Sequence, residues 1–79
     1  MMRILFFAHL KDVTGQREIE WHGGPVDIDD FWRNLLEIYP GLASFRPSVR
    51  LARNGEYVRN DVIFTDSDEV ALIPPVSGG

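Results

Sequence analysis

The sequence predicts an α+β fold, in which a mixed sheet of four to five strands carries one main helix packed on one face. Two segments, 17–21 and 49–53, alternate polar and apolar residues as half-buried strands do. A segment between them has apolar residues at helical spacing. The runs 3–10 and 69–73, near the two chain ends, are the most apolar strand-like segments, and we expect them side by side at the sheet centre.

The first predicted strand, residues 3–10, is apolar on both faces in its middle. This pattern is typical of a central strand that is covered at least partly on both sides. Phe6 is expected in the core, whereas Phe7 has the opposite parity and points to the other face.

Residues 11–16 are expected to form a turn, with Gly15 as the candidate for a positive φ. The strict alternation of 17–21 predicts a half-buried strand with Ile19 and Trp21 facing inward. Because the loop before it is short, we expect an antiparallel hairpin with the first strand.

A helix is predicted from Asp27, which is a good N-cap and is followed by two aspartates in the first turn. Pro40-Gly41 ends it. Residues 42–47 are ambiguous, and one interpretation is a helical turn ended by Pro47. The apolar stripe of the helix, expected in the core, consists of Ile28, Phe31, Trp32, Leu35, Leu36 and Tyr39.

The third strand is predicted at 49–53 and is followed by Asn54-Gly55, a strong hairpin-turn pair because both residues tolerate positive φ. A short fourth strand at 56–58 completes that hairpin. Residues 66–69 are expected to form a solvated acidic turn before the last strand, 69–73.

The predicted order is strand, strand, helix, strand, short strand, strand. One helix covers only one face of such a sheet. The connection between the first and last strands is long enough to make them parallel, which gives the β-grasp, or ubiquitin-like, arrangement. We expect residues 1–79 to form one such domain with a flexible C-terminal tail, 74–79.

Composition excludes several classes of function. A net charge of −4 and a pI near 4.9 argue against nucleic-acid binding and suit a partner that is basic near the contact. The chain has no cysteine and only two widely separated histidines, so a metal site is not expected. No apolar run is long enough to cross a membrane or forms a signal peptide, and a cytoplasmic location is predicted.

The C-terminal segment indicates chemistry at the chain end. Two prolines, Pro74 and Pro75, stiffen the exit from the last strand, and Gly78 and Gly79 carry no side chains. Such a tail is suited to enter a narrow pocket of another protein and to present the Gly79 carboxylate there. The residues expected to contact that partner through the tail are Pro74, Pro75, Val76, Ser77 and Gly78.

A second contact with the partner is expected on the exposed face of the sheet beside the tail. Phe7, Tyr57 and Ile73 are the candidates for an apolar patch there. The alternative for Phe7 is ordinary packing under a loop.

Three segments together resemble the small subunits of molybdopterin synthase, which are ubiquitin-like sulfur carriers. They are Leu5-Phe6-Phe7-Ala8, Asn54-Gly55 and the stretch from Asp68 through Pro-Pro-Val-Ser-Gly-Gly to the end. One departure is Ser67, which stands where that family usually has glycine, and mild strain is expected if the position needs a positive φ.

The resemblance implies a sulfur-donating subunit that has no catalytic side chains of its own. A ubiquitin-activating-like adenylyltransferase would use ATP and a metal to adenylate Gly79, and a sulfur donor protein would then convert it to a thiocarboxylate. The large synthase subunit, in an assembly expected to be a heterotetramer, would receive the sulfur for a pterin precursor of the molybdenum cofactor. The chain itself would bind no cofactor, no nucleic acid and no membrane.

Three alternatives remain open from the sequence. The chain could carry sulfur for another pathway, such as thiamine or tungsten-cofactor synthesis. It could be a ubiquitin-like modifier joined to lysines through Gly79, because the chemistry is shared up to the adenylate. It could also be a β-grasp interaction domain whose tail is inert.

Overall fold

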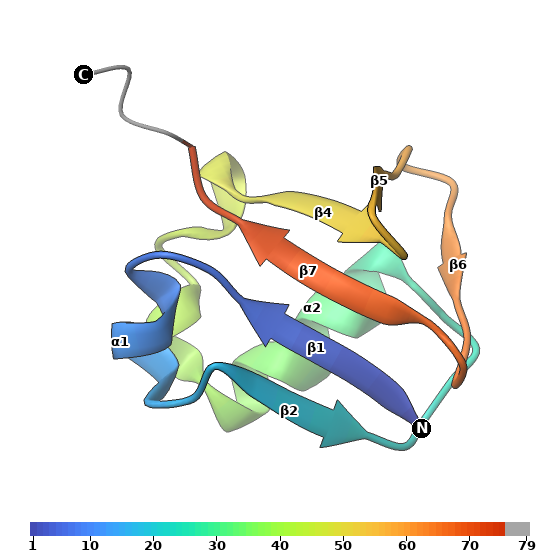
Figure 1. Ribbon diagram of the computed structural model, residues 1–79, viewed down its shortest axis with the longest axis horizontal. Helices are drawn as coiled ribbons and strands as arrows, with labels where there is room; N and C mark the ends of the chain where they lie inside the picture. Colours follow the sequence, from blue (N-terminus) through green and yellow to red (C-terminus); the bar gives the residue numbers. More distant parts are fainter. Residues whose placement is uncertain (76–79) are drawn as a thin grey trace.

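A computed structural model of the chain describes residues 1–75, and its centre is a five-stranded mixed sheet with the order β2-β1-β7-β4-β5 (Figure 1). The first and last of these strands, β1 and β7, are parallel neighbours at the centre, as predicted, and every other pair is antiparallel. The bounds are β1 Met2–Phe6, β2 Glu18–Trp21, β4 Arg50–Arg53, β5 Glu56–Tyr57 and β7 Glu69–Ile73.

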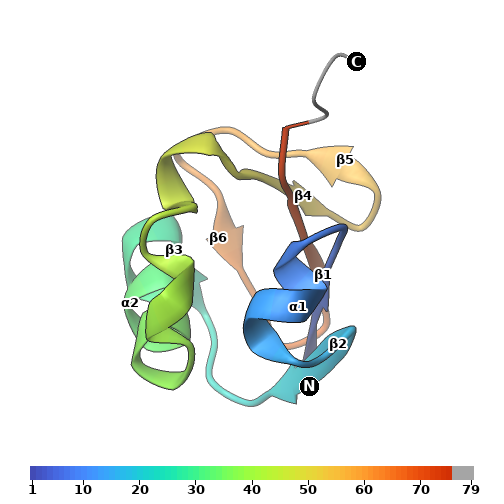
Figure 2. The ribbon, with the colours of Figure 1, turned by 90° about the vertical axis from the view of Figure 1, so that its left-hand side faces the viewer.

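The main helix, α2 (Ile28–Ile38), lies against one face of this sheet (Figure 2). Its N-terminus is fixed as predicted, because the Asp27 side chain accepts a hydrogen bond of 2.8 Å from the Asp30 N–H. The helix stops before Pro40, and its buried face consists of Phe31, Trp32 and Leu35.

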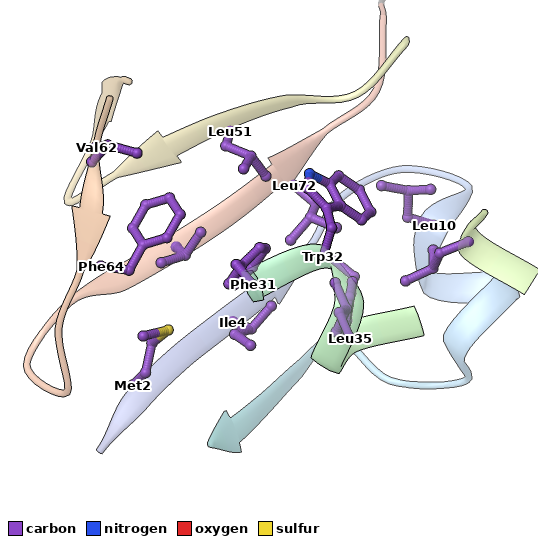
Figure 3. Close-up of a cluster of buried hydrophobic side chains, with 13 residues drawn as sticks. Met2, Ile4, Leu10, Phe31, Trp32, Leu35, Leu51, Val62, Phe64 and Leu72 are labelled. Atoms are coloured by element: carbon purple, nitrogen blue, oxygen red, sulfur yellow. The ribbon is translucent and has the colours of Figure 1, made fainter. Parts of the chain in front are cut away.

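The core lies between α2 and the inner face of the sheet, as Figure 3 shows. Alternate residues of the central strands point into it: Met2, Ile4 and Phe6 from β1, with Val70 and Leu72 from β7. Within residues 1–75, no helix lies against the other face of the sheet (Figure 2).

The predicted turn at 11–16 is instead a short helix, α1 (Leu10–Thr14), and β1 ends at Phe6 rather than at residue 10. The side chain of Leu10 is fully buried, and Val13 packs against the core, so this one turn of helix has an apolar side of its own. Gly15 ends it with φ 74°, which confirms the predicted positive φ.

Two strands were missed by the sequence analysis. Val26–Asp27 (β3) and Ile63–Phe64 (β6) form a small antiparallel sheet of their own. Phe64 is fully buried against α2, and its ring lies 5.1 Å from that of Phe31.

The stretch after α2 contains two 3₁₀ turns, η1 (Pro40–Leu42) and η2 (Arg46–Ser48). Pro47 lies inside the second turn, so the interpretation that it ends a helical turn was wrong; proline is accepted in the first turn of a helix because the N–H it lacks has no helical partner there. The strain expected at Ser67 is also absent, because Ala8 and Asn54 are the non-glycine residues with positive φ in the described chain.

Candidate functional site: the tail exit and the outer sheet face

The described part of the tail begins one residue later than the sequence suggested. Strand β7 ends at Ile73, which is half-buried and pairs with Arg50 of β4. Pro74 is buried, and Pro75 is exposed. Pro74 is therefore held by the domain, and the chain leaves the surface at Pro75. The predicted partner contacts Val76, Ser77 and Gly78 and the reactive Gly79 lie outside the described residues.

The uncovered face of the sheet, called here the outer face, has an apolar centre. Leu5 pairs with Ala71, and Ala71 pairs in turn with Ala52, so these three side chains form a row across β1, β7 and β4. Tyr57 continues the row on β5, because it pairs with Ala52. Leu5 and Ala71 are half-buried and Ala52 is buried, whereas Tyr57 is exposed at the side of the row.

Phe7 lies at the end of the outer face from which the tail leaves. Its N–H donates to the carbonyl of Leu72 (3.3 Å), so it sits beside the end of β7. Its side chain is 46% exposed, whereas Phe6, one residue earlier, is 2% exposed. Within residues 1–75, Phe7 is thus not packed under a loop. Its role in binding a partner remains a prediction.

Tyr57 lies on β5, on the other side of the outer face from Phe7. Its ring contacts Arg50, a residue that the sequence did not single out. The guanidinium of Arg50 sits 3.8 Å from the centre of the Tyr57 ring, in a cation–π contact. Since Arg50 also pairs with Ile73, it lies directly next to the tail exit. The alternation of 49–53 could have placed Arg50 on the outer face, but nothing in it indicates the tyrosine.

The other end of β7 is fixed by a polar cluster that sequence reasoning also missed. Asp68 was expected in a solvated turn, but it is only 9% exposed. One of its carboxylate oxygens accepts from the Asn54 side chain (3.1 Å), and the other from the Thr65 N–H (2.8 Å). Asn54 in turn accepts from the Glu69 N–H (2.9 Å). The β4–β5 turn is therefore tied to the start of β7.

Burial and hydrogen bonding have opposite effects on the pKa of Asp68. Burial alone raises the pKa of a carboxyl group, because it disfavours the charged form. The hydrogen bonds from Thr65 and Asn54, with the charge of Arg53, favour the carboxylate and outweigh burial, so the pKa of Asp68 lies below its ordinary value.

The described residues contain neither a cluster suited to a metal ion nor a helix suited to a membrane. Residues 1–75 contain no group of three or more histidine, cysteine, aspartate or glutamate side chains able to hold a metal ion. Over the same residues, no helix has the length and apolar character to span a bilayer.

Comparisons with known proteins agree with the fold. The model of the ThiS family matches residues 4–79. A relative from Drosophila erecta, named molybdopterin synthase sulfur carrier subunit, is 48% identical over 81 residues, which cover 99% of this chain and 90% of that protein. Small archaeal modifier protein 3 from Haloferax volcanii is 34% identical, with 99% and 98% covered. Among solved structures, SAMP1 from Haloferax volcanii has a TM-score of 0.81 at 30% identity, with 99% and 98% covered.

Proposed function

This chain belongs to the ThiS family, and from that premise we propose that it is the sulfur carrier subunit of a molybdopterin synthase. The observation that carries the proposal is the tail exit. The chain leaves the domain at Pro75, beside the apolar outer face, and four further residues ending in Gly78-Gly79 follow. In this proposal the outer face is the docking surface, and the segment that follows Pro75 carries the reactive group.

The chemistry we propose takes place at the Gly79 carboxyl group. An adenylyltransferase joins this carboxylate to the α-phosphate of ATP, which releases pyrophosphate and gives an acyl-adenylate. Sulfide from a sulfur donor then displaces AMP, a C–S bond replaces the C–O bond to the phosphate, and the product is a thiocarboxylate. The activation step is needed because a carboxylate is a poor electrophile without a good leaving group.

In this proposal the steps that need ATP, a metal ion or catalytic side chains belong to partner proteins. ATP and its metal ion belong to the activating enzyme in this proposal, since the positioning of phosphate and metal needs a dedicated pocket. The large synthase subunit takes in the charged tail and supplies the side chains for transfer of sulfur to the pterin precursor. Pro75 limits the freedom of the chain just after the exit, so less conformational entropy is lost when the tail enters a channel.

A second function is favoured by a specific relative. The modifier protein from Haloferax volcanii covers nearly the full length of this chain, so conjugation of Gly79 to a lysine amine of another protein is the alternative. Both functions pass through the same acyl-adenylate. They diverge in whether a sulfur nucleophile or an amine attacks it.

The experiment that separates them is intact-mass spectrometry after incubation with the activating enzyme of the same organism, ATP and a sulfur source. The carrier function predicts a mass gain equal to one exchange of oxygen for sulfur, which is absent when ATP is omitted. A variant lacking Gly79 should fold normally and gain nothing. Covalent adducts with other proteins, and no sulfur exchange, would support the modifier instead.

A further inference from the structure

Three basic side chains surround the end of the sheet from which the tail leaves. Lys11 lies in α1, directly after β1; Arg17 immediately precedes β2; Arg50 begins β4. Backbone hydrogen bonds and strand pairing place Arg17 and Arg50 beside the ends of β1 and β7. The Phe6 N–H donates to the Arg17 carbonyl (2.9 Å), and Arg50 pairs with Ile73, the last residue of β7. We call Lys11, Arg17 and Arg50 the basic collar.

The charges of the collar are not neutralised by neighbouring acids. All three residues are exposed, and within residues 1–75 none of them makes an ion pair of 4.0 Å or less. Asp12, next to Lys11 in the chain, is paired with none of them. Three arginines elsewhere differ in this respect, since carboxylates lie close to Arg3, Arg33 and Arg46.

Acidic side chains gather at the opposite end of the sheet. The turn before β7 and the first residue of that strand contribute three of them, and the strands on either side add more. These residues are Glu20, Glu56, Asp66, Asp68 and Glu69. Although the net charge is −4, Lys11, Arg17 and Arg50 thus place three cations without an ion pair at the tail end of the sheet; within residues 1–75, Arg53 and Arg59 are likewise in no ion pair.

The collar also borders apolar surface. A surface hollow of about 750 Å³ is lined by Leu5 and Phe7 together with Lys11 and Arg17, and also by Arg3 and Glu18, which form an ion pair with each other. On the other side of the exit, the Arg50 guanidinium covers the Tyr57 ring. Exposed aromatic side chains flanked by cations are suited to an interface in which the apolar centre is dry and the charged rim steers approach.

We infer that the protein surface receiving the tail carries carboxylates around the mouth of its channel, opposite Lys11, Arg17 and Arg50. This inference rests on the proposed function and goes beyond it by giving the charge of the contact. Net charge alone predicted a basic partner surface; the distribution of charge predicts an acidic one at this end. A nucleic acid is disfavoured as the occupant, because a polyanion would be repelled by the remaining surface and the apolar patch would stay uncovered.

The test uses the large synthase subunit of the same organism and measures its dissociation constant for the full chain at increasing salt. Lys11→Gln, Arg17→Gln and Arg50→Gln should each weaken binding by about twofold to fivefold, as expected for rim charges. The triple variant should weaken it further and should flatten the salt dependence. Arg33→Gln, which removes the same charge from α2 on the other side of the sheet, is the matched control and should bind as the unaltered chain does.

Arg50→Lys keeps the positive charge but removes the planar guanidinium that contacts the Tyr57 ring. Because the charge is retained, this variant should bind more tightly than Arg50→Gln. The inference is overturned if the collar variants lose no more affinity than Arg33→Gln, or if neutralisation strengthens binding. Failure of the unaltered chain to bind the large subunit would instead contradict the proposed function. The two failures are therefore distinguishable.

Discussion

At the scale of single residues, Asp68 determines where the last strand begins. Its carboxylate accepts from Asn54 on one oxygen and from Thr65 on the other, and its backbone carbonyl accepts from the Arg3 N–H (3.1 Å). Three parts of the chain thus meet at one residue. Because β7 carries the tail at its far end, a fixed start also fixes the position of the exit.

Asp68 should make stability depend on pH in the acid range. Its pKa is lower in the folded protein than the ordinary value of 3.8. A group of this kind stabilises the fold fully above its unfolded pKa, and the stabilisation is lost as pH falls through the lower folded value. We therefore expect the free energy of unfolding, measured with urea, to fall as pH drops below 3.8.

Asp68→Asn tests this, since the amide has one acceptor oxygen and cannot replace both. The substitution should cost about 1–3 kcal/mol at neutral pH, and the difference from the unaltered protein should shrink in acid. Asp66→Asn is the control, because Asp66 is exposed and makes only a 3.9 Å ion pair with the N-terminus and a 3.4 Å hydrogen bond from Gly23. A constant difference between Asp68→Asn and the unaltered protein at all pH values would contradict the assignment.

At the scale of elements, the long patterns could be predicted from the sequence and the short ones could not. The bounds of β7 and the N-cap of α2 agree with prediction, because a continuous apolar run after an acidic turn indicates a buried strand and a three-turn apolar stripe fixes the helical period. Strands β3 and β6 have two residues each, which is too few for any periodicity. Helix α1 has a single turn, and its apolar side is set by a core that only the folded protein contains.

The candidate site also combines features that the sequence could predict with features that it could not. Parity along β1 places Phe7 opposite Phe6, so the apolar outer face could be expected from alternation alone. The side-chain partners could not. The Asn54–Asp68 contact depends on the register between β4 and β7, which a single sequence does not give. The Arg50–Tyr57 contact lies within the predicted hairpin, but the strand pattern does not indicate which side chains stack there.

The two faces of β1 yield a matched pair of substitutions. Phe6 is buried in the core, so Phe6→Ala should destabilise the fold by about 3–5 kcal/mol. Phe7 is nearly half exposed on the outer face, so Phe7→Ala should change stability far less and should weaken binding to the large subunit more. Thermal melting and a binding titration on the same samples measure both.

Phe7→Arg extends this test, because a charge in the centre of a dry contact is disfavoured. It should bind more weakly than Phe7→Ala at a similar melting temperature. Equal losses of stability for Phe6→Ala and Phe7→Ala would show that Phe7 belongs to the core.

At the scale of the whole molecule, the fold and the proposed chemistry occupy different parts of the chain. The buried apolar side chains run from Met2 to Leu72, and Pro74 is the last buried residue that the structure describes. The residues whose atoms would react come after it. Substitutions at the chain end should therefore change sulfur loading without changing stability. Core substitutions should lower stability, and the molecules that remain folded should still be loaded.

A one-residue extension is the sharpest test of this separation. Addition of an alanine after Gly79 moves the terminal carboxyl group one residue further, and an active site built to hold a carboxylate at a fixed depth can no longer adenylate it. We expect an unchanged melting temperature and no mass gain from sulfur. Ser44→Ala is the control, since Ser44 is exposed and lies outside the tail, and this variant should still be loaded. Loading of the extended chain at the rate of the unaltered one would place the reacting group elsewhere than at the Gly79 carboxyl.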